Sequence, residues 1–249
     1  METGGRRAFH VKIALDTGTE IGQRTARIFL GDSRCERLVM INAGWIPRDD
    51  RVVHTRKFSD VDVVVSDGTT PLTSLIGRSS VVTAPLVFWP DVPTSEYGAA
   101  SIPVIVGANV GSTLADALLT HPSSLPVPED TVRVAWTEPG TPHRNGAPIA
   151  FPDPIGMAWS DERASGRFVA LRDDEWGGAT TIVEGPSGQR IVGVADLGVH
   201  LEALTLASVA FSAAAGSFEP GIQSTATARG AILVEARNLE LDIAVWRSV

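Results

Sequence analysis

The chain has 249 residues, of which 43% are hydrophobic and 20% charged, an ordinary globular composition. Its net charge of −8 gives an acidic surface that repels phosphate backbones and anionic lipids, so nucleic acid and membranes are poor partner candidates. One cysteine, Cys35, excludes an intramolecular disulfide and fits a reducing, cytoplasmic location. The length allows a nucleotide-binding domain with a smaller second domain.

Strand-like and helix-like stretches alternate through the first half of the chain. Helices are predicted at residues 20–30 and 111–121. Strands are predicted at residues 9–15, 37–42, 61–66, 80–84, 102–106 and 132–136. This alternation with glycine-containing turns predicts βαβ units and a parallel sheet.

The pattern changes after residue 136. Residues 139–154 hold five prolines and predict a linker or long ordered loop. Strands are predicted at residues 167–172, 180–184 and 189–194, the last two as an antiparallel hairpin. A long helix follows at about residues 197–215, and residues 231–246 suit either helix or strand. We therefore predict an α/β fold with a Rossmann-like parallel sheet (residues 8–138) and a smaller α+β domain (residues 139–249).

Neither the N-terminal residues nor the most apolar stretch of the chain has the pattern of a signal peptide or a membrane span. Residues 1–7 are polar and glycine-rich, unlike a signal peptide. The most apolar stretch, residues 197–216, carries polar side chains and predicts a buried helix rather than a membrane span. The same helix would also suit a homodimer interface.

The first predicted strand, turn and helix contain KIALDTGTEIG, residues 12–22. A dinucleotide site needs such a strand, a tight glycine turn and a helix start, whose amides receive the pyrophosphate. Only one glycine fits either usual spacing, and Asp16 and Glu20 place carboxylates near the expected phosphates. One like-charge pair at about 5 Å costs about 3 kcal/mol, unless the carboxylates point away or pair with Arg24 or Arg27.

Further cofactor contacts are expected where later strands end. Asn42, after the second strand, could hydrogen-bond a ribose. Arg48 and Arg51 would favour NADP if they met a 2′-phosphate, but they also suit a surface loop. Because ligands of open α/β sheets bind beyond the carboxyl ends of strands, the residues after the third and fifth strands should line a crevice.

Three motifs carry a resemblance to a known family. They are LDTGTEIG, DVDVVVSDGTTP and IPVIVGANVGSTLADALL, within about the first 140 residues. The chain resembles the saccharopine-dehydrogenase-like and homoserine-dehydrogenase-like oxidoreductases, with a degenerate glycine fingerprint. The resemblance implies a Rossmann fold, hydride transfer and NADP or NAD as cofactor. It implies cofactor contacts from Asp16, Thr17, Gly18, Thr19, Glu20, Ile21, Gly22, Asn42, Ser66, Asp67, Gly68 and Asn109.

Acid–base candidates come from the second half. Asp196 and His200 stand four residues apart, a helical spacing at which the carboxylate would orient the imidazole and raise its pKa. The alternative is an acid favouring the helix dipole beside an ordinary histidine. His143, in the proline-rich stretch, could line a substrate site. No cluster has convincing zinc spacing, so no metal is expected.

The first functional hypothesis is an NAD(P)-dependent oxidoreductase acting on a small carbonyl, imine or amino-acid-like substrate, with His200 as acid–base group. The second is a Rossmann protein that has lost the dinucleotide and catalyses isomerisation, cyclisation or elimination, with Asp16 and Glu20 as acid–base or amine-binding groups. A third is a non-catalytic binding protein, because fold alone does not fix function.

Overall fold

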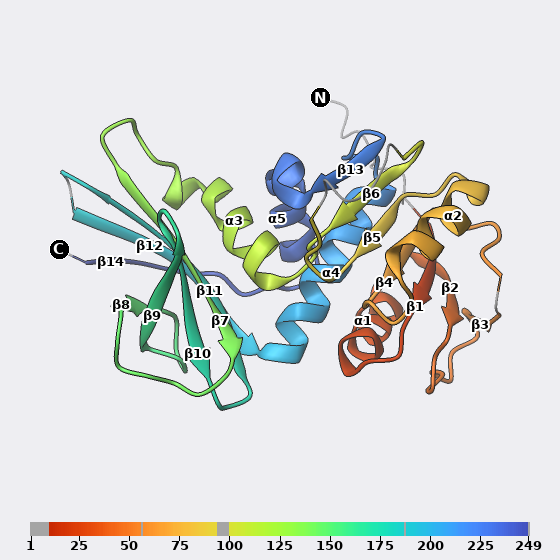
Figure 1. Ribbon diagram of the computed structural model, residues 1–249, viewed down its shortest axis with the longest axis horizontal. Helices are drawn as coiled ribbons and strands as arrows, with labels where there is room; N and C mark the ends of the chain where they lie inside the picture. Colours follow the sequence, from red (N-terminus) through yellow and green to blue (C-terminus); the bar gives the residue numbers. More distant parts are fainter. Residues whose placement is uncertain (1–9, 56, 94–99, 187, 249) are drawn as a thin grey trace, which may run out of the picture.

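The computed structural model describes residues 10–55, 57–93, 100–186 and 188–248, so the prediction for residues 1–7 lies outside the described residues. Two β-sheets lie at opposite ends of the molecule, with helices between them (Figure 1). None of the described helices has both the length and the apolarity to cross a membrane. The predicted class, α/β with a Rossmann-like sheet and a second sheet, is confirmed.

The first sheet has seven parallel strands in the order β13-β6-β5-β4-β1-β2-β3. Without β13, this is the order of a Rossmann fold. The strands are β1 (Val11–Asp16), β2 (Cys35–Ile41), β3 (Val52–His54), β4 (Val63–Ser66), β5 (Leu86–Phe88), β6 (Pro103–Val106) and β13 (Gly221–Ser224). β1 and β4 pair side by side and are almost wholly buried, as their continuous apolar runs predict.

The second sheet has the order β14-β12-β11-β7-β10-β9-β8, and its pairs are antiparallel except β7 with β10. Its strands are β7 (Thr131–Pro139), β8 (Ala147–Ala150), β9 (Met157–Ala164), β10 (Arg167–Arg172), β11 (Trp176–Gly185), β12 (Gly188–Leu197) and β14 (Ala244–Ser248). The predicted hairpin is confirmed, because β11 and β12 pair up to Gly185 and Gly188.

The described residues form four longer helices: α1 (Glu20–Gly31), α2 (Leu72–Val82), α4 (Gly198–Ala214) and α5 (Arg229–Asn238). The predicted helix at residues 111–121 forms as consecutive short turns rather than one regular helix. These turns are η2 (Val110–Leu114), α3 (Ala115–Ala117) and η3 (Leu118–Thr120). Two further 3₁₀ turns are η4 (Pro122–Ser124) and η5 (Thr225–Ala228).

Three details of the sequence prediction are wrong. The strand predicted at residues 80–84 is the end of α2, which stops where Thr83 adopts a left-handed φ of 55°. The predicted sixth strand, residues 132–136, belongs to the second sheet as β7. Asp196 lies in β12 rather than in the helix, which begins at Gly198.

The edge strand next to β6 in the first sheet is β13, which comes from the last part of the sequence. β13 pairs with β6 in parallel, from Gly221 opposite Pro103 to Ser224 opposite Val106. The second half of the chain therefore returns to the first sheet after forming most of the second. The boundary at residue 138 stays a prediction.

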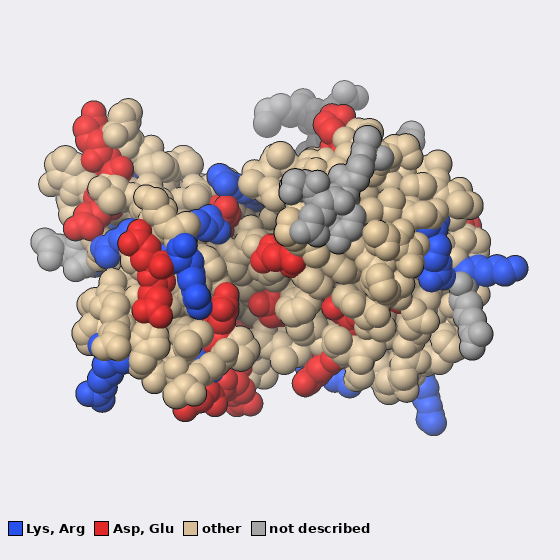
Figure 2. Space-filling model, in the orientation of Figure 1, with Lys and Arg blue, Asp and Glu red and all other residues tan. Residues whose placement is uncertain are grey.

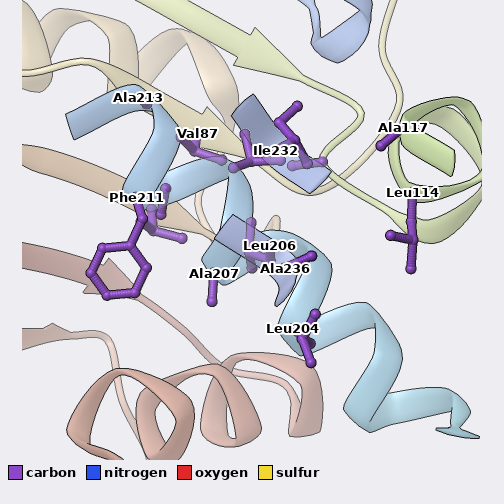
Figure 3. Close-up of a cluster of buried hydrophobic side chains, with 14 of the residues drawn as sticks. Val87, Leu114, Ala117, Leu204, Leu206, Ala207, Phe211, Ala213, Ile232 and Ala236 are labelled. Carbon is purple, nitrogen blue, oxygen red and sulfur yellow. The ribbon is translucent and has the colours of Figure 1, made fainter. Parts of the chain in front are cut away.

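Helix α4 joins the two sheets. It contacts α1, α5, β4 and β5 on one side and β11 and β12 on the other. Its side chains from Ala203 to Ala213 are all buried, so the apolar sequence covers the whole helix surface rather than one stripe. Figure 3 shows Leu206 and Phe211 of this helix in one cluster with Val87 of β5 and Ile232 of α5. The apolar surface that would suit a dimer is used inside the chain.

The turn between β1 and α1 depends on close contact at Gly22. A Cβ atom there would lie 1.8 Å from Thr17 Oγ1 and 2.5 Å from Asp67 Oδ2. Thr19 caps the helix, since its side-chain oxygen accepts a hydrogen bond from the Gly22 amide. A side chain at position 22 would therefore push the turn away from the helix.

We predict that Gly22→Ala lowers the free energy of unfolding by about 3 kcal/mol, because the new methyl group overlaps the turn. Gly31→Ala in the same helix is the control, since a Cβ there meets nothing within 4 Å. It should be neutral or stabilise by up to about 0.5 kcal/mol. Urea denaturation measures both, and equal stability of the two variants would contradict the packing argument.

Candidate functional site

The carboxyl edge of the first sheet is organised by two buried carboxylates. Asp16, at the end of β1, is fully buried. Its oxygens accept hydrogen bonds from the Asn42 amide at 2.6 Å, the Ser66 hydroxyl at 2.8 Å, and the Thr70 hydroxyl and amide at 2.8 and 3.1 Å. Asp16 thus joins the exits of β1, β2 and β4. It does not line the cleft described below.

Asp67, just after β4, closes the β1–α1 turn. Its Oδ2 accepts hydrogen bonds from the Gly18 amide at 3.1 Å and the Thr19 amide at 2.9 Å. The Thr17 and Thr19 hydroxyls donate to the same oxygen at 2.8 and 2.7 Å, and Thr69 donates twice to Oδ1. Burial alone would raise the pKa of Asp67, but the hydrogen bonds from Thr69, Thr19 and Thr17 outweigh it and lower the pKa.

Two further amides of the turn stay available. Within the part of the chain that the structure describes, no hydrogen bond has the Glu20 or Ile21 amide as its donor. They are the first two residues of α1, whose N–H groups have no partner inside the helix. Both residues line the main cleft. The turn therefore offers two amides to an anion, whereas Asp67 occupies the other two.

The other residues predicted to bind a cofactor mostly hold the edge together. Asn42 donates to Asp16 and Thr70, and Asn109 caps η2 by accepting a hydrogen bond from the Ser112 amide. A Cβ on Gly68, whose φ is 93°, would lie 2.7 Å from Pro90. Arg51 pairs with Asp49 and donates to three backbone carbonyls, so it is not free for a 2′-phosphate.

A cleft of about 500 Å³ lies between the two sheets. The first sheet and its loops contribute Glu20, Ile21, Trp89 and Val110. The second sheet contributes the ends of β7, β10 and β11, and α4 contributes its first turn. A smaller cavity of about 220 Å³ adjoins it and shares Trp89, Glu138 and Glu202. The cleft is therefore at the carboxyl edge of the Rossmann sheet, where α/β proteins bind ligands.

Glu202 of α4 is the most perturbed acid in this cleft. Burial raises its pKa to about 7, and the charges of Asp91 and Glu138 act in the same direction. The Trp89 indole and the Val110 amide oppose this, since they donate to its Oε2 at 2.9 and 3.1 Å. Its Oε1 accepts no hydrogen bond from the described residues. A carboxyl group with a pKa near 7 and a free oxygen can exchange protons at neutral pH.

The cleft carries a strong negative charge. Besides Glu202, four carboxylates line it, and its one arginine, Arg172, forms an ion pair with Asp174. The four are Glu20, Glu138, Asp174 and Glu175. Acidic side chains also lie along the hollow between the two halves of the molecule in Figure 2. Such a lining favours a cationic ligand group, such as an amine.

The predicted pair Asp196 and His200 is close together, with 3.6 Å between Oδ2 and Nε2. His200 Nδ1 accepts a hydrogen bond from Arg24 Nε at 2.9 Å. Burial and Arg24 lower the pKa of His200, and Asp196 only partly opposes them. Asp196 acts on this pKa in the expected direction, but burial outweighs it and the net shift is downward. His200 does not line the main cleft; it lines a second cavity beside it.

His143 lies elsewhere, paired with Asp161 at 2.9 Å, and it is absent from the cleft lining.

The sequence analysis did not identify Glu202 as a functional residue. The signal that could have found it is a single acid inside the most apolar stretch of the chain. A carboxylate in such a helix must find donors or a cavity, because a buried unpaired charge is costly.

We compared the chain with known proteins. No family model matches it, and no curated protein sequence matches it. Solved structures do share its fold. A homospermidine synthase from Legionella pneumophila, in complex with NAD, has a TM-score of 0.59 at 8% identity and covers 96% of this chain and 92% of its own.

Two other structures are similar. An engineered D-amino acid dehydrogenase bound to NADP+ has a TM-score of 0.53 at 12% identity, covering 87% of this chain and 93% of its own. A DAP dehydrogenase from C. glutamicum, in complex with DAP, has a TM-score of 0.52 at 12% identity, covering 88% and 93%. Two of these three structures hold NAD or NADP+, and two of the three proteins are dehydrogenases. At such low identity the likeness shows the fold alone.

We predict that Asp67→Asn lowers the free energy of unfolding at pH 7 by about 2 kcal/mol, because an amide cannot accept all six hydrogen bonds. Since the folded state lowers the pKa of Asp67 below 3.8, its contribution is present above that pH and is lost as the pH falls. The stability of the variant should therefore depend less on pH in the acid range. Urea denaturation between about pH 3 and 7 measures this, with Asp50→Asn at an exposed turn as control. Equal losses in both variants would contradict the role of Asp67.

Proposed function

We propose that this chain is an NAD(P)-dependent oxidoreductase that acts on a small amine- or imine-bearing, amino-acid-like substrate, with Glu202 as its proton-transfer group. The observation that carries the proposal is the Glu202 carboxyl group, with its pKa near 7, in an acidic cleft at the carboxyl edge of a Rossmann sheet. The proposal moves the acid–base role from His200 to Glu202.

The substrate class follows from the charge of the cleft. Glu138 lines the cleft and accepts a hydrogen bond from the Trp136 indole at 3.0 Å. Glu20, Glu175 and Glu202 have no ion-pair partner within the described residues. A protonated amine would supply the missing positive charge, whereas a neutral carbonyl compound would not.

The residues of the first turn fit a dinucleotide through their backbone. The Glu20 and Ile21 amides would hold a phosphate group at the start of α1, where the helix dipole favours negative charge. A bound nicotinamide would supply hydride transfer to or from a substrate carbon. Glu202 would give the proton that the neighbouring nitrogen needs on reduction and take it back on oxidation.

A second candidate function rests on Asp67. Its carboxylate already binds the Gly18 and Thr19 amides, so the turn holds an internal anion where a pyrophosphate would find donors. This favours a protein that has lost the dinucleotide and uses Glu202 for non-redox proton transfer, as in isomerisation, cyclisation or elimination. In this candidate function we leave Asp16 out of the chemistry, because its described hydrogen bonds all lie within the edge of the sheet.

Cofactor binding separates the two candidates. We expect NADPH or NADH to raise the melting temperature of the purified chain and to bind with a Kd on the order of 10–100 µM, since a ligand bound only by the folded state stabilises it. Nicotinamide fluorescence gives the affinity independently of melting. The absence of both responses at about 1 mM cofactor, with and without small amines and amino acids in the solution, would reject the oxidoreductase and leave the non-redox candidate.

Glu202→Gln tests the proton-transfer role. The amide keeps an acceptor for Trp89 and Val110 but cannot exchange the proton, so we expect kcat to fall about 100-fold or more. The substrates would be a panel of amino acids and small amines, with oxidation followed by nicotinamide absorbance. Glu129→Gln in an exposed loop is the control. Activity retained in Glu202→Gln would remove Glu202 from the mechanism.

The same variant should change stability with a definite sign. The folded state raises the pKa of Glu202 from 4.5 to about 7, so the wild-type chain loses stability as the pH rises between these values. Glu202→Gln should therefore be more stable than wild type by about 2 kcal/mol at pH 8 and little changed near pH 4.5.

A further inference from the structure

A second cavity, of about 150 Å³, lies between the start of α1 and the start of α4. It shares Glu20, Leu197 and Val199 with the main cleft, so the two spaces adjoin. Its remaining lining comes from Gln23, Arg24, Arg27 and His200. The charged residues of the main cleft are thus five acids and one arginine, whereas its neighbour has two arginines, a histidine and one acid.

Both arginines lack a carboxylate partner. Arg24 uses its Nε to bind His200 Nδ1, and no described carboxylate lies within ion-pair distance of its guanidinium. Arg27, one turn further along α1, lies over the Trp45 ring at 5.1 Å and likewise forms no ion pair within the described ranges. The sequence left open whether Glu20 pairs with either arginine, and it pairs with neither. In a chain with net charge −8, two neighbouring unpaired guanidinium groups are available to an anion.

His200 keeps Arg24 in place. Because its Nδ1 accepts a hydrogen bond, the ring is neutral and carries its proton on Nε2, on the side of Asp196. Asp196 is not part of the cavity lining. Glu20 is the one carboxylate that lines the cavity, and the two guanidinium groups outnumber it. His200 is therefore a positioning residue for Arg24.

We infer that Arg24 and Arg27 bind an anionic group of the substrate, a carboxylate or a phosphate, while its amine lies in the acidic cleft. Helix α4 sets this arrangement, because His200 and Glu202 are two residues apart and project into different cavities. The substrate would be a molecule with both charges, long enough to reach from one cavity to the other. The amine part of this inference rests on the proposed function, whereas the anion site at Arg24 and Arg27 does not depend on it.

The test uses inorganic phosphate as probe, at constant ionic strength set with sodium chloride. We expect phosphate to raise the melting temperature of the full chain and its affinity to fall at least about tenfold in Arg24→Gln and in Arg27→Gln. Arg27→Gln is the safer variant, because Arg27 is exposed and makes no described hydrogen bond. Arg163→Gln, at an exposed arginine of β9, should respond like wild type. No response in wild type, or equal responses in all variants, would overturn the inference.

Two further measurements distinguish a substrate anion site from failure of the proposed activity and from a site for the cofactor's 2′-phosphate. Glu202→Gln should still bind phosphate, so the anion site can stand if the proposed activity fails. If Arg24→Gln and Arg27→Gln weakened NADPH binding but not NADH binding, the anion would be the cofactor's 2′-phosphate, and the assignment to the substrate would be overturned. We expect both cofactors to bind these variants as they bind wild type.

Discussion

The structure depends on the burial of helix α4 between the two sheets. Nearly every side chain from Leu201 to Ala213 is buried, and its neighbours come from both sheets and from α1 and α5. Such a helix has no freedom to rotate, since turning it would expose apolar surface at about 25 cal/mol per Å². The directions of the two polar residues in its first turns are thereby fixed. At about 100° per residue, His200 and Glu202 point to different sides, and each meets a different cavity.

The composition of the first turn follows from a second constraint, the two buried carboxylates at the sheet edge. A buried carboxylate needs several donors, and backbone amides alone do not supply enough of them. Thr17, Thr19 and Thr69 provide the hydroxyl donors for Asp67, and Ser66 and Thr70 provide them for Asp16. This explains why Thr19 stands where a G-x-x-G-x-x-G fingerprint would have a glycine. The turn is thus held by internal hydrogen bonds without any ligand, and among the described hydrogen bonds none has the Glu20 or Ile21 amide as its donor.

Much of the fold could be predicted from local patterns, and the failures have physical causes. β4 is almost entirely a continuous apolar run, and β1 and β2 each contain one, which only a doubly covered sheet can bury. β13 carries no such run, and its pairing with β6 joins residues more than a hundred positions apart. Glu202 is a similar case: burial and the charge of Asp91 raise its pKa, whereas hydrogen bonds from Trp89 and Val110 lower it, and the sequence places all three residues far away. Periodicity predicts that α4 is buried, but not which cavity meets its few polar residues.

The balance of charges in the cleft links cofactor and substrate. A phosphate at the start of α1 gains up to about 2 kcal/mol from the helix dipole. One unneutralised carboxylate at about 5 Å, such as that of Glu20, costs about 3 kcal/mol at an effective dielectric constant near 20. The turn alone therefore does not favour a dinucleotide. A cationic amine in the cleft removes part of that cost, because it neutralises the same carboxylates that repel the phosphate. An oxidoreductase built on this chain would thus bind its cofactor better with a substrate amine present, whereas a non-redox enzyme would need only the amine.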